Sequence, residues 1–180
     1  AGPPFKPDTW RTPGYPLFLA TAMLLFGKSP VTLVLVQQAL SALNVLLVFR
    51  LARGWMSDTR AALAAVLFLL EPYHLFYSLW LLSTTWLVTV VLVTWWAWVR
   101  AIGSGEKWRF ALLGGLCGFL VLTWPGAILI PVAVFVGIII AWLRSLLLRK
   151  ATGSGVGVLI FTVVCSCVVG SWMARNQRAG

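Results

Sequence analysis

The stretch Leu70-Glu-Pro-Tyr-His-Leu-Phe-Tyr-Ser-Leu-Trp-Leu-Leu-Ser-Thr-Thr-Trp86 separates two long apolar parts of the chain. It holds His74, the only histidine, and Glu71, one of four acidic residues. An ionisable side chain is costly in hydrocarbon, so such a pair usually faces water or a cavity lined by protein. Two interpretations remain open. The pair lines a functional site, or it marks the turn where the chain leaves the membrane.

The composition is that of an integral membrane protein. Of the 180 residues, 61% are hydrophobic and 10% are charged, and the mean hydropathy is +0.95. A soluble domain is about half apolar and about a quarter charged. The net charge of +10 comes from Lys and Arg in the short gaps between apolar runs. That pattern is a topology signal, and we expect no nucleic-acid partner.

The apolar runs predict an all-α, polytopic membrane helix bundle with about six spanning helices and one short interfacial helix. Residues 1–14 are rich in Pro and Gly and predict the end of an outer-face loop, so we expect the chain to begin in mid-protein. Residues 15–28 are too short to cross the membrane and predict the interfacial helix. The bundle is expected at residues 29–178, with spans near 30–49, 60–79, 83–99, 109–123, 126–143 and 153–174.

Two spacings predict helix packing. Gln37, Ser41 and Asn44 recur at i, i+4 and i+7, so they share one helix face. A polar stripe in a spanning helix usually contacts another helix, which we favour over substrate contact. Gly114-x-x-x-Gly118 permits a second helix to approach closely. Pro72 is expected to interrupt or kink the third span.

The positive charges predict an orientation. Nine lie on one side of the predicted spans and five on the other. The nine are Arg50, Arg53, Arg60, Arg100, Lys107, Arg109, Arg144, Arg149 and Lys150. The positive-inside rule places these in the cytoplasm. The N-terminal loop, the region around Glu71, the turn at Trp124 and the C-terminus are then expected to face outward.

The unusual chemistry of the chain gathers at that outer face. Arginines beside tyrosines and a carboxylate suit an anionic, hydroxyl-rich ligand such as a sugar phosphate. No serine-nucleophile, zinc-protease, CxxC or Walker-type motif is present, and no metal site is predicted. The candidate substrate-binding residues are Arg11, Tyr15, Glu71, Tyr73, His74, Tyr77 and Arg175.

The segment Arg11-Thr-Pro-Gly-Tyr-Pro-Leu-Phe-Leu-Ala20 resembles the membrane glycosyltransferases of the GT-C superfamily. The similar branch contains the protein O-mannosyltransferases and the aminoarabinose transferases. Further similar segments follow in order along nearly the whole chain. They are Gly27-Lys-Ser-Pro30 with Gln37-Gln-Ala-Leu40, Leu70-Glu-Pro-Tyr-His-Leu-Phe-Tyr-Ser78, Leu122-Thr-Trp-Pro125 and Ser171-Trp-Met-Ala-Arg-Asn176.

The resemblance implies a mannosyltransferase-like enzyme of the bacterial cell envelope, in the inner membrane. It would move a sugar, with inversion, from a polyprenyl-phosphate donor to a glycan, lipid or protein acceptor on the extracytoplasmic face. The implied catalytic acid precedes residue 1, and Asp8 is expected to be an ordinary loop residue. Arg11 and Tyr15 would lie near that acid, and Arg175 would approach the lipid phosphate. The resemblance implies no certain cofactor and leaves metal dependence open.

Two departures from the family pattern stand out. Thr84 lies where relatives often carry glutamate, and Trp124 where they often carry arginine. We infer that the glutamate and the arginine form an ion pair in relatives, because losing both together leaves no unpaired buried charge. Two alternative functions remain. Helices interrupted by Pro and Gly and the Glu71–His74 pair also suit a transporter or flippase-like protein. A non-catalytic membrane partner would need no base within the chain.

Overall fold

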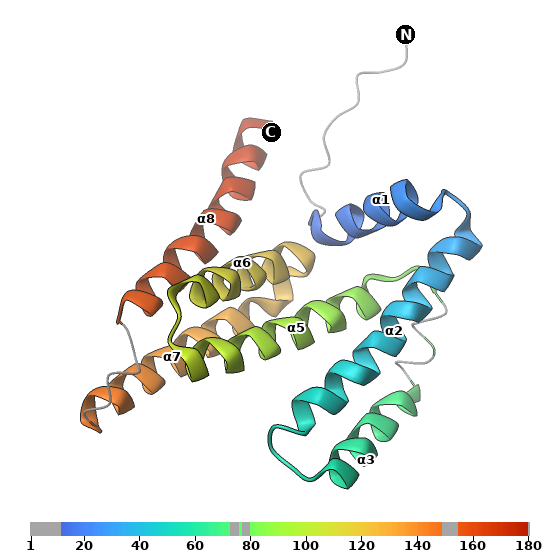
Figure 1. The fold of residues 1–180 in the computed structure, drawn as a ribbon. Helices are drawn as coiled ribbons and strands as arrows, with labels where there is room; N and C mark the ends of the chain where they lie inside the picture. The colour runs from blue at the N-terminus through green and yellow to red at the C-terminus, as the bar shows by residue number, and fades with distance from the viewer. Residues whose placement is uncertain (1–11, 73–75, 77–79, 149–154, 180) are drawn as a thin grey trace. The chain divides into compact units, whose positions relative to one another are not determined.

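The computed structural model describes residues 12–72, 76, 80–148 and 155–179, and within these ranges the regular structure is entirely helical (Figure 1). This confirms the all-α class. The helices are α1 (Gly14–Phe26), α2 (Pro30–Ala52), α3 (Asp58–Leu69), α5 (Ser83–Ser104), α6 (Lys107–Thr123), the 3-10 turn η1 (Pro125–Ile128), α7 (Leu129–Leu147) and α8 (Gly155–Ala179).

Among the described residues, four helical segments are long and apolar enough to cross a membrane: Pro30–Ala52, Ser83–Ser104, Pro125–Leu147 and Gly155–Arg178. They support an integral membrane protein, and α1 is a shorter apolar helix as expected. The expected number of about six spans is not confirmed. Helix α3 has 12 residues and α6 has 17. At 1.5 Å per residue, α6 reaches about 25 Å, less than the roughly 30 Å of hydrocarbon.

The predicted span at residues 60–79 is not one unbroken helix. Helix α3 ends at Leu69, with Leu70 as its C-terminal cap, ahead of Pro72. Proline disfavours the α conformation in the residue before it and cannot donate a backbone hydrogen bond. The expected interruption is therefore present.

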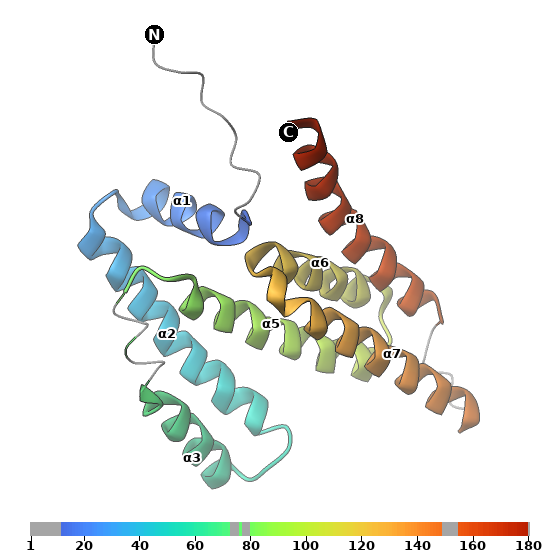
Figure 2. The ribbon, with the colours of Figure 1, turned by 180° about the vertical axis from the view of Figure 1, so that it is seen from behind.

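The chain divides into two compact units, which are described separately. One unit contains residues 15–104 and the other contains residues 1–14 and 105–180. In the first unit, α2 and α3 run side by side as an antiparallel pair (Figures 1 and 2). The buried residues of α3 are Ala61 and Ala65. Their small side chains allow α3 to approach α2 closely.

The polar stripe of α2 contacts α5 within the same unit. Gln37, Ser41 and Asn44 are all buried. The Gln37 side-chain amide donates a hydrogen bond to the backbone carbonyl of Trp80, just before α5. The Asn44 amide donates one to the carbonyl of Thr85 in α5, at 3.3 Å. The prediction that this stripe holds two helices together is confirmed.

In the second unit, the two glycines of α6 lie directly against α8. A Cβ added at Gly114 would lie 2.6 Å from the carbonyl oxygen of Phe161. A Cβ added at Gly118 would lie 2.7 Å from the Cβ of Val168. No larger residue fits either position without separating the helices. The close approach predicted from Gly114-x-x-x-Gly118 is confirmed, and the partner helix is α8.

The same interface contains a reciprocal contact in which α8 supplies the glycine. The buried ring of Phe110 in α6 lies over Gly157, where an added Cβ would be 2.9 Å from the ring. Helix α7 joins this core through Phe135, whose ring stacks with that of Phe161 at 6.4 Å. The core of this unit is therefore built from α6, α7 and α8.

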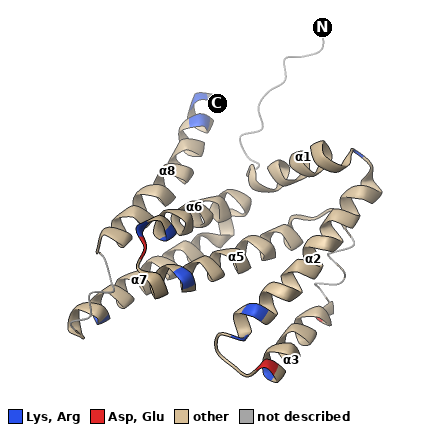
Figure 3. Cartoon of the chain, viewed as in Figure 1, with Lys and Arg blue, Asp and Glu red and all other residues tan. Residues whose placement is uncertain are grey.

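Lysine and arginine lie near the ends of the helices, and the long apolar stretches between carry none (Figure 3). Arg50, Arg144 and Arg178 fall in the last turns of α2, α7 and α8. Cations there are favoured by the helix dipole. The side of the membrane on which each group lies stays a prediction.

Candidate functional site

The structure describes three of the predicted substrate-binding residues. Tyr15 and Glu71 lie in the unit of residues 15–104, and Arg175 lies in the other unit. The remaining predicted residues lie outside the described ranges, and so does the candidate acid. These are Asp8, Arg11, Tyr73, His74 and Tyr77.

Tyr15, in the first turn of α1, belongs to an aromatic stack. Its ring centroid is 6.0 Å from that of Phe18, and Phe18 stacks on Trp86 of α5 at 4.5 Å with ring planes 17° apart. Burial raises the pKa of the Tyr15 phenol above its ordinary value. The phenol is therefore neutral at physiological pH. Its hydroxyl oxygen is buried and has no hydrogen-bond partner in the described part of the chain.

The first turn of α5 links this stack to the polar stripe. Thr85 accepts the hydrogen bond from Asn44 of α2, and its neighbour Trp86 stacks on Phe18 of α1. Successive residues of a helix point about 100° apart, so one turn can contact two other helices at once. Thr85 is buried, and its carbonyl also accepts a hydrogen bond from Thr89 at 2.9 Å. One turn of α5 thus joins the aromatic stack of α1 to the polar stripe of α2.

Phe18 and Thr85 were missed as contributors by reasoning from the sequence. Phe18 follows Tyr15 at i+3, which is a local signal that the two rings share a face. No comparable signal joins Phe18 to Trp86, because the two lie far apart in the sequence. Only the fold brings these rings together.

Glu71 follows the end of α3. Its backbone N–H donates to the carbonyl of Phe68 at 3.4 Å, and its side chain is partly exposed. The next residue is Pro72. Glu71 is thus held at the end of a helix, where a carboxylate can reach a solvated ligand.

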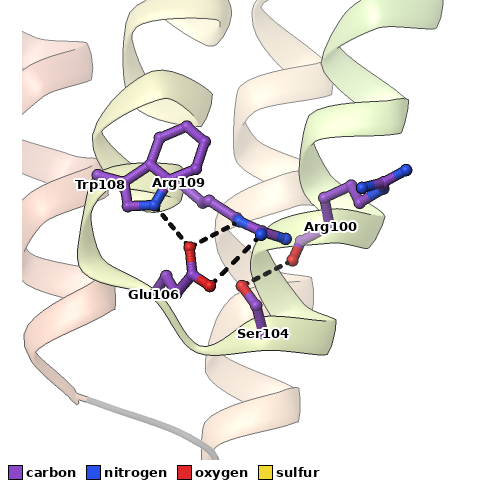
Figure 4. A network of polar contacts seen from close by, with 5 residues as sticks. All are labelled: Arg100, Ser104, Glu106, Trp108 and Arg109. Atoms are coloured by element: carbon purple, nitrogen blue, oxygen red, sulfur yellow. Dashed lines mark hydrogen bonds and ion pairs between the residues drawn. The ribbon is translucent and has the colours of Figure 1, made fainter.

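Two other acidic residues make local ion pairs at the ends of helices. Asp58 binds Arg53 at 2.8 Å. Glu106, which precedes α6, accepts hydrogen bonds from Arg109 at 3.0 Å and from the Trp108 indole at 2.6 Å (Figure 4). These pairs hold turns in place and give no reason to expect catalysis.

Arg175 is exposed on the C-terminal part of α8. Its guanidinium lies over the ring of Trp172, 4.7 Å from the centroid. Such a cation–π contact restrains the arginine while leaving its N–H groups able to bind an anion. Since α8 is long enough to span the membrane, this pair suits an anionic group near the end of a span.

The segment after Arg11 is anchored to the end of α6. The Thr12 hydroxyl donates to the carbonyl of Thr123 at 3.1 Å. A Cβ at Gly14 would lie 2.7 Å from the Cα of Thr123, so only glycine fits there. The next residue, Trp124, is 55% exposed. Thr84 and Trp124 lie in different units. That relatives carry an ion pair at these two positions stays a prediction.

Metal ligands do not gather in the parts of the chain that the structure describes: no group of three or more His, Cys, Asp or Glu could hold an ion there. The described candidate residues are, in one unit, a buried phenol within an aromatic stack and a carboxylate after a helix end, and, in the other unit, an arginine restrained by an indole. That these residues line one cavity stays a prediction.

The chain was also compared with known proteins. The model of a family described as dolichyl-phosphate-mannose-protein mannosyltransferase matches residues 8–172. The match includes Tyr15 and Glu71 and ends before Arg175. No curated protein and no solved structure matches the chain.

Proposed function

The chain belongs to the dolichyl-phosphate-mannose-protein mannosyltransferase family, and we propose that it transfers a sugar from a polyprenyl-phosphate donor to an acceptor on the extracytoplasmic face of a bacterial membrane. The observation that carries this proposal is the family match over residues 8–172, in a chain whose described residues include four apolar helical segments long enough to span. The coarser activity, that of a membrane glycosyltransferase, follows from the family.

In the proposed reaction, the bond between the anomeric carbon and the phosphate oxygen breaks. The phosphate leaves with the electron pair as polyprenyl phosphate. A hydroxyl or amine of the acceptor attacks the anomeric carbon from the opposite side, so the configuration inverts. A carboxylate base takes the acceptor proton. We propose that this base precedes residue 1 rather than being Asp8.

The residues of the chain would bind and orient the two substrates. We propose that Arg175, restrained over Trp172, binds the donor phosphate through charge-assisted hydrogen bonds. The neutral phenol of Tyr15 would hydrogen-bond a sugar or acceptor hydroxyl beside the Phe18–Trp86 stack. Glu71 and the neighbouring residues Tyr73, His74 and Tyr77 would line the acceptor side.

The test for the carboxylate uses the protein at its full natural length in membranes, with a radiolabelled polyprenyl-phosphate sugar. Glu71→Gln is expected to lower transfer, because the amide has one accepting oxygen where the carboxylate has two. Glu106→Gln is the matched control, since Glu106 binds Arg109 in a local turn. Transfer by Glu71→Gln at the parental rate would remove Glu71 from the site.

The test for the phosphate contact compares Arg175→Gln with Arg178→Gln on the same helix. A hydrogen bond to a charged group contributes about 1.5–3 kcal/mol, so the KM for the donor should rise roughly 10- to 100-fold for Arg175→Gln. It should change little for Arg178→Gln. If the wild-type protein moves the lipid-linked sugar across vesicles but transfers it to no acceptor, the transporter alternative holds instead.

A further inference from the structure

The turn between α2 and α3 is held rigidly. The backbone N–H groups of Trp55 and Met56 both donate to the carbonyl of Ala52, at 2.9 and 3.0 Å. Arg53, which directly follows α2, forms an ion pair across the turn with Asp58 at the start of α3. Its guanidinium also lies 5.5 Å from the ring centroid of Phe49. The backbone of this turn is therefore held by hydrogen bonds and by an ion pair across it.

The charges of the turn do not cancel. Arg53 is paired with Asp58, the only acidic residue between positions 50 and 60. Arg50 and Arg60 are exposed and make no ion pair with any described residue. The turn consequently carries two uncompensated positive charges. The link from α1 to α2, at the other end of the same helix, carries only Lys28.

The turn also presents apolar surface. Trp55 is 73% exposed and Met56 is 40% exposed. Helix α2 has 23 residues, which gives a length of roughly 34 Å, close to the thickness of a bilayer core. The end of a spanning α2 therefore reaches the boundary between hydrocarbon and headgroups. Tryptophan prefers this depth, and arginine there meets lipid phosphates.

We propose that the α2–α3 turn, residues 50–60, is a binding surface for anionic phospholipid headgroups. Trp55 and Met56 enter the interface, while Arg50 and Arg60 contact the negative charge. A neutral lipid would satisfy the apolar side chains but not the two arginines, and a free phosphate would satisfy the arginines but not Trp55. An anionic lipid satisfies both.

The experiment places a fluorophore within the turn. Met56→Cys is labelled in a Cys167→Ser background, because Cys167 is the exposed native cysteine. The protein, at full natural length, is reconstituted in nanodiscs of phosphatidylcholine containing a minority of brominated phosphatidylglycerol or of brominated phosphatidylcholine. The background protein without the added cysteine measures labelling elsewhere. Quenching by the brominated anionic lipid should exceed quenching by the brominated neutral lipid, and added salt should reduce the excess.

Charge variants test whether Arg50 and Arg60 bind the anionic lipid. Each Arg→Gln change should weaken binding of the anionic lipid about five-fold, which corresponds to about 1 kcal/mol per residue near an anionic surface. The double variant Arg50→Gln/Arg60→Gln should therefore lose about 25-fold in affinity. Lys28→Gln, at the opposite end of α2, should leave it unchanged.

Three results would overturn the proposal. One is equal quenching by the two brominated lipids, which would show a neutral interfacial anchor. Another is an unchanged lipid preference in the double variant, provided that its circular dichroism and elution volume match those of the parent. The third is complete displacement of the lipid by inorganic phosphate, which would show a general anion site.

Discussion

Gly114→Ala tests the contact between α6 and α8 most directly. The added Cβ would lie 2.6 Å from the carbonyl oxygen of Phe161, 3.2 Å from the Cβ of Val164 and 3.3 Å from the backbone nitrogen of Cys165. Ordinary contact begins near 3.4 Å, so the helices must separate locally by about 0.8 Å (3.4 − 2.6). Two of these neighbours are backbone atoms, which cannot rotate away as the end of a side chain can.

The expected cost follows from two opposing effects. Overpacking of a well-packed contact costs about 1–3 kcal/mol. Replacing glycine by alanine within a helix returns up to about 1 kcal/mol of helix propensity. Gly115→Ala is the matched control, because nothing lies within 4 Å of a Cβ at that position. The propensity gain is common to both variants. The difference between their free energies of unfolding therefore gives the cost of the contact, about 1–3 kcal/mol.

The assay is unfolding of the full-length protein from mild detergent by sodium dodecyl sulfate, followed by circular dichroism. Gly114→Ala should unfold at the same fraction of dodecyl sulfate as the parent or at a lower one. Gly115→Ala should unfold at the same fraction as the parent or at a higher one. If the two variants unfold together, or if Gly115→Ala is the weaker, the packing of α6 on α8 described above is wrong.

Two further changes probe the other contacts. Gly14→Ala forces a Cβ against the backbone of Thr123 and should cost about 1–3 kcal/mol in the same assay, whereas Gly103→Ala meets no atom within 4 Å and should not destabilise. Asn44→Ala removes the buried amide that α2 donates to α5 and should cost about 1–3 kcal/mol, from a hydrogen bond and a small cavity. Leu43→Ala, at a 45% exposed neighbour, should cost less than about 0.5 kcal/mol, and equal losses for the two would contradict a role for the stripe.

Features that depend on helical periodicity could be predicted from the sequence. The face shared by Gln37, Ser41 and Asn44 follows from 3.6 residues per turn, and so does the glycine face of Gly114 and Gly118. The partner of each face could not be predicted, because neither spacing specifies which distant helix will fill it. The contacts of Thr85 and Phe161 are long-range, and only the fold reveals them.

Helix ends were predicted less well, and the reason is physical. Helix α2 continues through Arg50 to Ala52, and α5 continues through Arg100 to Ser104. Hydropathy falls at an arginine, yet the backbone hydrogen bonds need not stop there. The long arginine side chain can reach the headgroups while its stem stays beside apolar surface. The last turn of a helix also favours a cation. The apolar runs therefore predict helices that are shorter than those observed.

The candidate site could be predicted by its residue types and not by its geometry. The acidic residues show this best, because the chain has four and their contacts cannot be read from the sequence. The structure uses Asp58 and Glu106 in ion pairs with nearby arginines at the ends of helices. Each of these carboxylates thus binds an arginine within a local turn. Glu71 lies just after the end of α3 and ahead of Pro72, and we keep it as the candidate for substrate contact, with Glu106 as the control because Glu106 binds Arg109 in a local turn. A loss of transfer in Glu106→Gln that matched the loss in Glu71→Gln would mean that the ion pair, and not the helix end at Pro72, positions the reacting groups.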